Sequence, residues 1–180
     1  MNARKLMLAL AIFSAGSHAQ EKLFHAGDLS ESALIEALDP DAQARQRAGA
    51  QVMRSIRVLR DDRPAAQPKA SLLVTFATNS AVLTQEARNA LDVVARALAS
   101  NQLANFQFSI EGHADPRGTR EGNLQLSQLR AEAVRRYLAQ SGKIDAARLQ
   151  AIGKGDSEPL DLENPEAQKN RRVTIATLVR

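Results

Sequence analysis

The stretch from Phe106 to Gly142 predicts a strand, a turn and a helix in direct succession. Phe106, Phe108 and Ile110 alternate with polar residues, and this period of two predicts a half-buried β-strand. A polar loop punctuated by glycines follows, and a helix predicted to begin near Asn123 then runs to a stop at Gly142. The apolar side predicted for this helix consists of Leu126, Leu129, Ala133, Val134, Tyr137 and Leu138.

Regular patterns on either side of this stretch complete the predicted fold. Residues 72–76 are a β-rich run, and Thr84 is the predicted N-cap of a helix that extends to about Ala99. Leu149 to Ile152 predicts a third strand, Asn164-Pro165 predicts a helical turn, and residues 173–177 predict a last strand. The order β-α-β-α-β-(α)-β predicts a two-layer α/β sandwich, with a mixed sheet and helices on one face.

Residues 1–19 have the three parts of a secretory signal peptide. Arg4 and Lys5 form a basic start, an apolar run extends from Leu6 to Phe13, and small residues at Ser17 to Ala19 provide a cleavage site. The apolar run is much shorter than the ~20 residues that a membrane-spanning helix needs. We therefore expect the leader to be cleaved and the protein to be exported.

Residues 20–70 have a less regular hydrophobic pattern than the rest of the chain. A capping box at Asp28 to Glu31 predicts a short amphipathic helix up to about Leu38. The stretch from Arg45 to Arg63 contains six arginines against two aspartates, predicts at best a weak strand, and leads into a proline-containing linker. This basic stretch is either a solvated connector or a contact with an anionic surface. We expect a helix and linker over residues 20–70 and the folded domain over residues 71–180.

The composition narrows the classes of ligand and chemistry. The chain has no cysteine, which excludes disulfides, thiol catalysis and a lipid-modified cysteine. Its formal net charge is +4, and removal of the leader takes away two of these positive charges. With five phenylalanines, one tyrosine and no tryptophan, this mildly basic chain favours an anionic cell-wall or membrane surface over nucleic acid.

Asp115 and Arg130 form the candidate binding pair. Asp115 follows the predicted strand in what we expect to be an exposed loop, and Arg130 lies about two turns into the predicted helix. Glycines and a proline let this loop fold back over the start of the helix. An aspartate suits an ammonium group and the fork of an arginine suits a carboxylate, so the pair can hold a small zwitterion. The same two residues could instead form an ion pair with each other.

Three motifs surround this pair: G-H-A-D at Gly112 to Asp115, R-G-T at Arg117 to Thr119, and N-x-x-L-S-x-x-R-A at Asn123 to Ala131. Together they resemble the signature of the OmpA C-terminal family of peptidoglycan-binding domains. The resemblance covers roughly Ser71 to Leu178. It implies the same α/β sandwich that the periodicity predicts.

The resemblance also implies a ligand and a set of site residues. In this family, the aspartate and arginine that match Asp115 and Arg130 hold the diaminopimelate terminus of the peptidoglycan stem peptide without a covalent bond. Many members carry an aspartate where this chain has Ala77, so no side-chain carboxylate is expected there. The resemblance assigns lesser roles to Ala114, Asn123, the Thr78-Asn79 turn and the Asn170-Arg171-Arg172 run, of which Arg172 is the predicted site residue.

These features predict a periplasmic adaptor or structural protein of the cell envelope that binds peptidoglycan. We expect it to associate with the outer membrane only through partners, with residues 20–70 as the candidate contact for an envelope protein. No cofactor, no metal and no nucleic acid are expected among its ligands.

The alternative function is a hydrolase that acts on peptidoglycan, either an amidase or a peptidase. His113 lies in an H-x-D motif, but His18 is in the leader and His25 is distant in sequence, so no histidine pair has the spacing of metal ligands. A serine nucleophile would need a G-x-S-x-G elbow, which the chain does not contain. We therefore expect a binding module and not an enzyme.

Overall fold

The structure is a computed structural model that describes residues 22–25, 28–42, 44–45, 67–74, 76 and 79–178. The predicted leader, most of the basic stretch, Ala77 and Thr78 lie outside these residues. In the described part of the chain, no helix is both long enough and apolar enough to cross a membrane.

A five-stranded mixed sheet forms the frame of the molecule, in the order β1-β2-β5-β3-β4. The strands are β1 (Lys22–Phe24), β2 (Lys69–Leu72), β3 (Gln107–His113), β4 (Leu149–Gly155) and β5 (Val173–Leu178). β1 runs parallel to β2 and β3 runs parallel to β4, whereas β5 lies antiparallel between β2 and β3. The mixed sheet that the sequence predicts is therefore confirmed.

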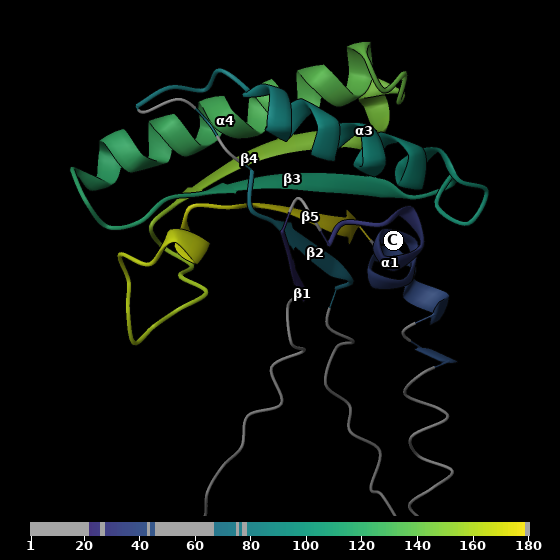
Figure 1. Cartoon of the computed structure of the whole chain (residues 1–180), viewed down its shortest axis with the longest axis horizontal. Coiled ribbons are helices and arrows are strands. Elements are labelled where there is room, and N and C mark those ends of the chain that lie inside the picture. Colours follow the sequence, from purple (N-terminus) through teal and green to yellow (C-terminus); the bar gives the residue numbers. More distant parts are fainter. Residues whose placement is uncertain are drawn as a thin grey trace, which may run out of the picture.

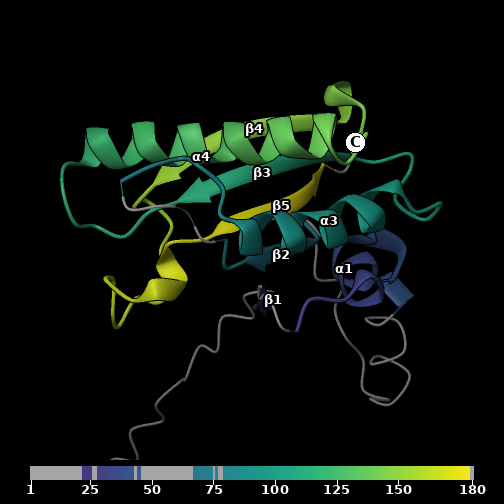
Figure 2. The same cartoon turned by 45° about the horizontal axis from the view of Figure 1, so that its top comes forward.

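Three helices named below lie on one side of this sheet, with α3 and α4 above it (Figure 1). They are α1 (Glu31–Leu38), α3 (Gln85–Ala99) and α4 (Arg120–Gln140). α3 begins where the sequence predicts, because the Thr84 hydroxyl accepts a hydrogen bond from the Ala87 amide at 3.1 Å. Figure 2 shows α3 and α4 crossing the sheet side by side, with α1 near one end of α3. The predicted two-layer sandwich is thus confirmed.

β1 and α1 join this sheet and its core, although we expected residues 20–70 to lie apart from the folded domain. Phe24 is buried in β1, which pairs with β2 at the edge of the sheet. Leu34 and Leu38 of α1 are fully buried, and the Thr177 hydroxyl of β5 donates a 2.6 Å hydrogen bond to the Leu38 carbonyl oxygen. The apolar side of this short helix is therefore covered by the end of the sheet and by α3.

β3 is buried on both faces, so the prediction of a half-buried strand is wrong. Phe108 and Ile110 face the helices, as expected. Ser109 and Glu111 point to the other face, but they are buried as well. The Glu111 carboxylate accepts hydrogen bonds from the Ser109 hydroxyl at 3.2 Å and from the Lys69 ammonium at 3.3 Å. Ser109 on the same strand and Lys69 on β2 thus replace the water that a solvent-facing carboxylate would bind.

α4 lies directly on the backbone of β3 and β4 along its N-terminal half. A Cβ atom added to Gly112 would overlap the carbonyl oxygen of Ser127. A Cβ atom added to Gly153 would lie 2.7 Å from the backbone nitrogen of Gln128, which is also too close. These two glycines are therefore required because the helix backbone occupies the space of a side chain.

α4 differs from the predicted helix in two ways. α4 begins at Arg120 and not near Asn123, because the Thr119 hydroxyl caps it by accepting from the Gly122 amide at 3.1 Å. Leu129, which we placed on the packed side, is 53% exposed. No room for a large side chain remains above the glycines, so small and polar residues face the sheet there. The buried side of α4 consists of Asn123, Ser127, Ala131, Val134 and Leu138.

Replacement of Gly153 by alanine should destabilise the fold by about 1–3 kcal/mol, since a methyl group there collides with backbone that cannot move aside. Urea unfolding measures the change. Gln150→Ala is the matched control, because Gln150 is exposed on the same strand and its loss should change the free energy of unfolding by at most about 0.5 kcal/mol. Equal stabilities of the Gly153 and Gln150 variants would contradict the proposed contact of α4 with β4.

Candidate functional site

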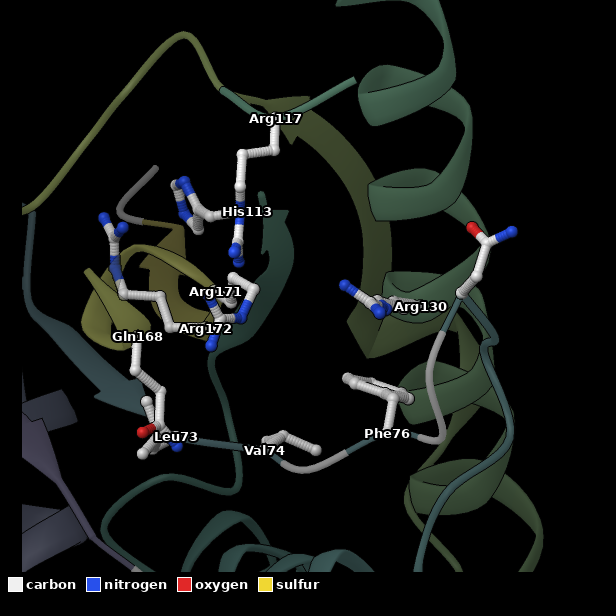
Figure 3. Close-up of a pocket in the computed structure, with 10 residues that line it drawn as sticks. Leu73, Val74, Phe76, His113, Arg117, Arg130, Gln168, Arg171 and Arg172 are labelled. Atoms are coloured by element: carbon white, nitrogen blue, oxygen red, sulfur yellow. The ribbon is translucent and has the colours of Figure 1, made fainter. Parts of the chain in front are cut away.

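A pocket of about 380 Å³ opens at the edge of the sheet where β2 and β3 end and β5 begins. One wall comes from the chain that follows β2 and another from α4, and the 3-10 helix Gln168–Asn170 lies beside the chain that enters β5. Figure 3 shows its side chains converging on an open centre. Four of them are arginines, and we call this site the arginine-lined pocket: Leu73, Val74, Phe76, Asn79, His113, Arg117, Arg130, Gln168, Arg171 and Arg172.

The Asp115 carboxylate is held by two of these arginines. Arg117 reaches it with Nη2 at 2.6 Å from Oδ2 and with Nε at 3.2 Å from both oxygens. The backbone amide of Arg117 also donates to Oδ1, at 3.2 Å. From the other side, Nη1 of Arg171 donates to Oδ2 at 2.7 Å. The carboxylate thus accepts hydrogen bonds at both oxygens.

Two expectations about Asp115 are corrected by this geometry. Its loop is exposed at residues 116–119, but Asp115 itself is only 6% exposed. The ion pairs that it forms within the described residues are with Arg117 and Arg171, and not with Arg130. The sequence analysis named Arg171 only within a run given a lesser role, and it paired neither arginine with Asp115. Arg171 is 56 residues away from Asp115 along the chain, so sequence spacing could not indicate this contact.

The two guanidinium groups lower the pKa of Asp115 from 3.8 to about 2. The hydrogen bonds from the Arg117 side chain are the largest cause, burial acts in the opposite direction, and the hydrogen bond from Arg171 lowers the pKa further. Asp115 is therefore ionised at neutral and mildly acidic pH.

Arg130 is fixed on the opposite wall of the pocket. Its Nε donates to the Ser80 carbonyl oxygen at 3.1 Å, and its guanidinium lies 4.9 Å from the centre of the Phe76 ring. Figure 3 shows the guanidinium above Phe76 and pointing across the pocket towards Arg171. Burial lowers the pKa of Arg130, and the positive charge of Arg171 lowers it further, whereas Asp115 partly offsets both. An anion between Arg130 and Arg171 would remove this repulsion.

A single buried asparagine organises the loop that carries Arg171 and Arg172. Asn170 accepts hydrogen bonds from the amides of Leu160 and Asp161 and donates to three carbonyl oxygens of the same loop. The Arg172 side chain is 4% exposed, and its Nε donates to the Ser71 hydroxyl at 3.2 Å. Arg172 therefore lines the pocket from a buried position, and Arg171 is the member of this run that contacts Asp115.

Of the remaining predicted site residues, two are buried beside Asp115, one lines the pocket and one lies outside the described residues. Asn123 is buried, and its Nδ2 donates to the Asp115 carbonyl oxygen at 3.0 Å, so it holds the loop in place. Ala114 is also buried, with its amide bonded to the Gly155 carbonyl oxygen. Asn79 lines the pocket with a φ of 49°, a left-handed conformation that asparagine tolerates. Thr78 lies outside the described residues, and its role stays a prediction.

The H-x-D motif does not form a metal site in the structure. His113 is 2% exposed, and its backbone amide donates to the Arg172 carbonyl oxygen at 2.9 Å. Across the described ranges, no cluster of three or more His, Cys, Asp or Glu side chains could hold a metal ion. His113 is thus part of the packed end of β3.

The fold is that of an OmpA-like domain, and this chain belongs to the OmpA family. The sequence model of that family matches residues 75–172, which is more than half of the chain. The matched residues extend from the chain after β2 to the arginines that precede β5. They contain every residue that lines the pocket except Leu73 and Val74.

Individual relatives agree with this assignment. The chain is 39% identical over 102 residues to the peptidoglycan-associated lipoprotein of Pseudomonas putida, an alignment covering 56% of this chain and 59% of that protein. It spans about three fifths of the length of the curated relatives it matches. The crystal structure of the peptidoglycan-associated lipoprotein from Burkholderia pseudomallei is 34% identical, with a TM-score of 0.51 over 60% of this chain and 89% of that one. The OmpA-like domain of FopA1 from Francisella tularensis shares the fold at 21% identity, with a TM-score of 0.52 over 60% of this chain and 70% of that one.

The lowered pKa of Asp115 predicts how the fold responds to acid. Because the folded pKa is about 2 and the ordinary value is 3.8, Asp115 stabilises the fold fully above pH 3.8 and loses this effect as the pH falls through about 2. Wild type should therefore exceed Asp115→Asn in stability by about 2 kcal/mol at neutral pH, since one pKa unit is about 1.4 kcal/mol. The gap should shrink between pH 4 and pH 2 in urea unfolding. A gap that does not change with pH would show that the charge of Asp115 is not what stabilises the loop.

Proposed function

We propose that this protein binds peptidoglycan without a covalent bond and holds the diaminopimelate terminus of the stem peptide in the arginine-lined pocket. The observation that carries this proposal is a fixed guanidinium, Arg130, on one wall of the pocket, together with a buried and ionised carboxylate, Asp115, that is bound by two other arginines of the pocket lining. Membership of the OmpA family supports it, as do relatives that are named peptidoglycan-associated lipoproteins.

The carboxylate of the ligand would bind to Arg130. The contacts with Ser80 and Phe76 fix the Nε side of the guanidinium and leave its terminal amino groups directed into the pocket. Among the described residues, these amino groups donate no hydrogen bond. A guanidinium that is already oriented loses little side-chain freedom when an anion arrives. The ligand carboxylate would also relieve the repulsion between Arg130 and Arg171.

The ammonium of the ligand would bind to Asp115. Its lowered pKa keeps the carboxylate charged, and Asn123 and the Gly155 carbonyl oxygen fix the backbone on which it is carried. Diaminopimelate ends in an ammonium and a carboxylate on one carbon, so it offers both groups within one short terminus. Lysine at the same stem position offers the ammonium alone.

The cellular role that follows is that of a periplasmic protein that links a partner to the cell wall. The relatives named above are longer than the matched region, so any partner of this chain is part of the proposal and not of the comparison. We propose that residues 20–70 provide the contact with such a partner.

The proposal predicts discrimination between two wall chemistries. Purified sacculi with free diaminopimelate should bind more tightly than lysine-type sacculi by a factor of about 10–100, because a half-buried guanidinium left without its anion costs about 1.5–3 kcal/mol. Co-sedimentation over a range of protein concentrations measures both affinities. Equal binding to the two walls would overturn the paired-charge arrangement.

Arg130→Lys should remove most of this discrimination, because a point charge cannot reproduce the planar fork held by Ser80 and Phe76. Arg136→Lys is the matched control, since Arg136 is exposed on the same helix and does not line the pocket. Measurement of both variants against both walls, with melting temperatures recorded in parallel, separates loss of binding from loss of folding. Normal discrimination by Arg130→Lys would show that another group binds the carboxylate.

A further inference from the structure

Hydrogen-bond donors of the protein itself already occupy both oxygens of the Asp115 carboxylate. Oδ1 accepts from the amide and Nε of Arg117, and Oδ2 accepts from Nε and Nη2 of Arg117 and from Nη1 of Arg171. An incoming ammonium also needs one of these acceptor positions. If the proposed function is correct, on which this inference rests, one of the two guanidinium groups must leave before the ligand can bind.

Arg117 is the guanidinium that can leave. Its side chain is 57% exposed, and within the described residues it donates hydrogen bonds only to Asp115. It lies in the exposed loop ahead of α4, next to Gly118, which has a φ of 93°. Figure 3 shows the Arg117 side chain extending from the rim into the pocket.

Arg171 is held in place by further contacts and is expected to remain bound to Asp115. Its side chain is 37% exposed, and the same Nη1 that binds Asp115 also lies 3.4 Å from the Glu166 carbonyl oxygen. Its neighbours Asn170 and Arg172 are both buried and hydrogen-bonded, so its backbone is fixed on both sides. When Arg117 departs, Arg171 still compensates part of the charge of Asp115.

We propose that Arg117 occupies the ammonium position of the binding site in the free protein and is displaced by the ammonium of the ligand. The exchange replaces one cation on Asp115 with another, so the buried carboxylate is never left without a partner. It also makes Arg117 a specificity-determining residue, because a ligand without an ammonium cannot displace it. When a ligand with only a carboxylate enters the pocket, Asp115 would therefore still be bound to Arg117.

The test uses the full exported chain and a soluble tripeptide stem, L-Ala-γ-D-Glu-meso-diaminopimelate, in isothermal titration calorimetry. Arg117→Gln should bind this tripeptide about two- to five-fold more tightly than wild type, because displacement of an exposed ion pair costs little and that cost disappears. Arg120→Gln is the control, since Arg120 is an exposed arginine that lies three residues after Arg117 and does not line the pocket. It removes the same charge from the same region and should leave the affinity unchanged.

A second ligand separates displacement from direct contact. The same tripeptide acetylated on the terminal amine of diaminopimelate keeps the carboxylate but lacks the ammonium, so Arg117→Gln should not tighten its binding. Weaker binding of Arg117→Gln to both ligands would overturn the proposal and make Arg117 a direct contact of the ligand. Equal gains with both ligands, or the same gain with Arg120→Gln, would also overturn it and indicate a general charge effect.

The outcome also distinguishes this inference from the proposed function. If Asp115→Asn and Arg130→Lys abolish binding while Arg117→Gln leaves it unchanged, peptidoglycan binding stands and displacement of Arg117 is refuted. If wild type binds neither the tripeptide nor sacculi, the proposed function fails and this inference fails with it. Thermal melts of each variant confirm that the fold is intact, which is expected because the Arg117 side chain is largely exposed.

Discussion

The direct contact between α4 and the backbone of β3 and β4 is the constraint on which the rest of this structure depends. It exists only because Gly112 and Gly153 have no side chains where the helix crosses the strands. The contact fixes the height of α4 above the sheet, and therefore the distance of Arg130 from the end of β3. It also decides which residues can face the sheet, and for this reason Ser127 is buried while Leu129 is exposed. A motif that reads as a binding signature is thus in part a packing requirement.

The same contact is continued by hydrogen bonds at the start of the helix. Asn123 donates to the Asp115 carbonyl oxygen, and the Ser127 hydroxyl accepts from the Gly155 amide at 2.9 Å. These two bonds join α4 to the ends of β3 and β4, where an open loop would otherwise move freely. Because the bonds are buried, their donors and acceptors would be costly to leave unpaired. The loop that carries Asp115 is therefore held by the helix that carries Arg130, and the two opposite charges are positioned by one rigid unit.

The architecture could be predicted from the sequence to a large extent, whereas the contacts within the site could not. Helical and strand periodicity predicted the element order from β2 onward, and the N-cap at Thr84 was placed correctly. It did not predict β1, and it placed the first strand at residues 72–76, whereas β2 lies at Lys69–Leu72. Periodicity failed at Glu111, because alternation indicates which side a residue faces but not whether another charged group, here Lys69, covers that side. It failed again at Leu129, where glycines on the sheet reverse the usual preference for large apolar residues. The pairing of Asp115 with Arg171 joins segments far apart in sequence, and only the register of β3 with β5 brings them together.

If the pocket binds a zwitterion as proposed, the arrangement of its charges explains why it contains more arginines than the ligand has carboxylates. Asp115 must stay ionised to attract an ammonium, yet a buried carboxylate without partners would raise its own pKa and become neutral. Arg171 and Arg117 prevent this, since they lower the pKa to about 2 even though burial acts against them. A single fixed arginine would suffice while the ligand is bound, because the ammonium would supply the second cation. In the proposed exchange, a second and exposed arginine is useful only before the ligand binds, and Arg117, which is 57% exposed and lies 2.6 Å from the carboxylate, is placed for this role.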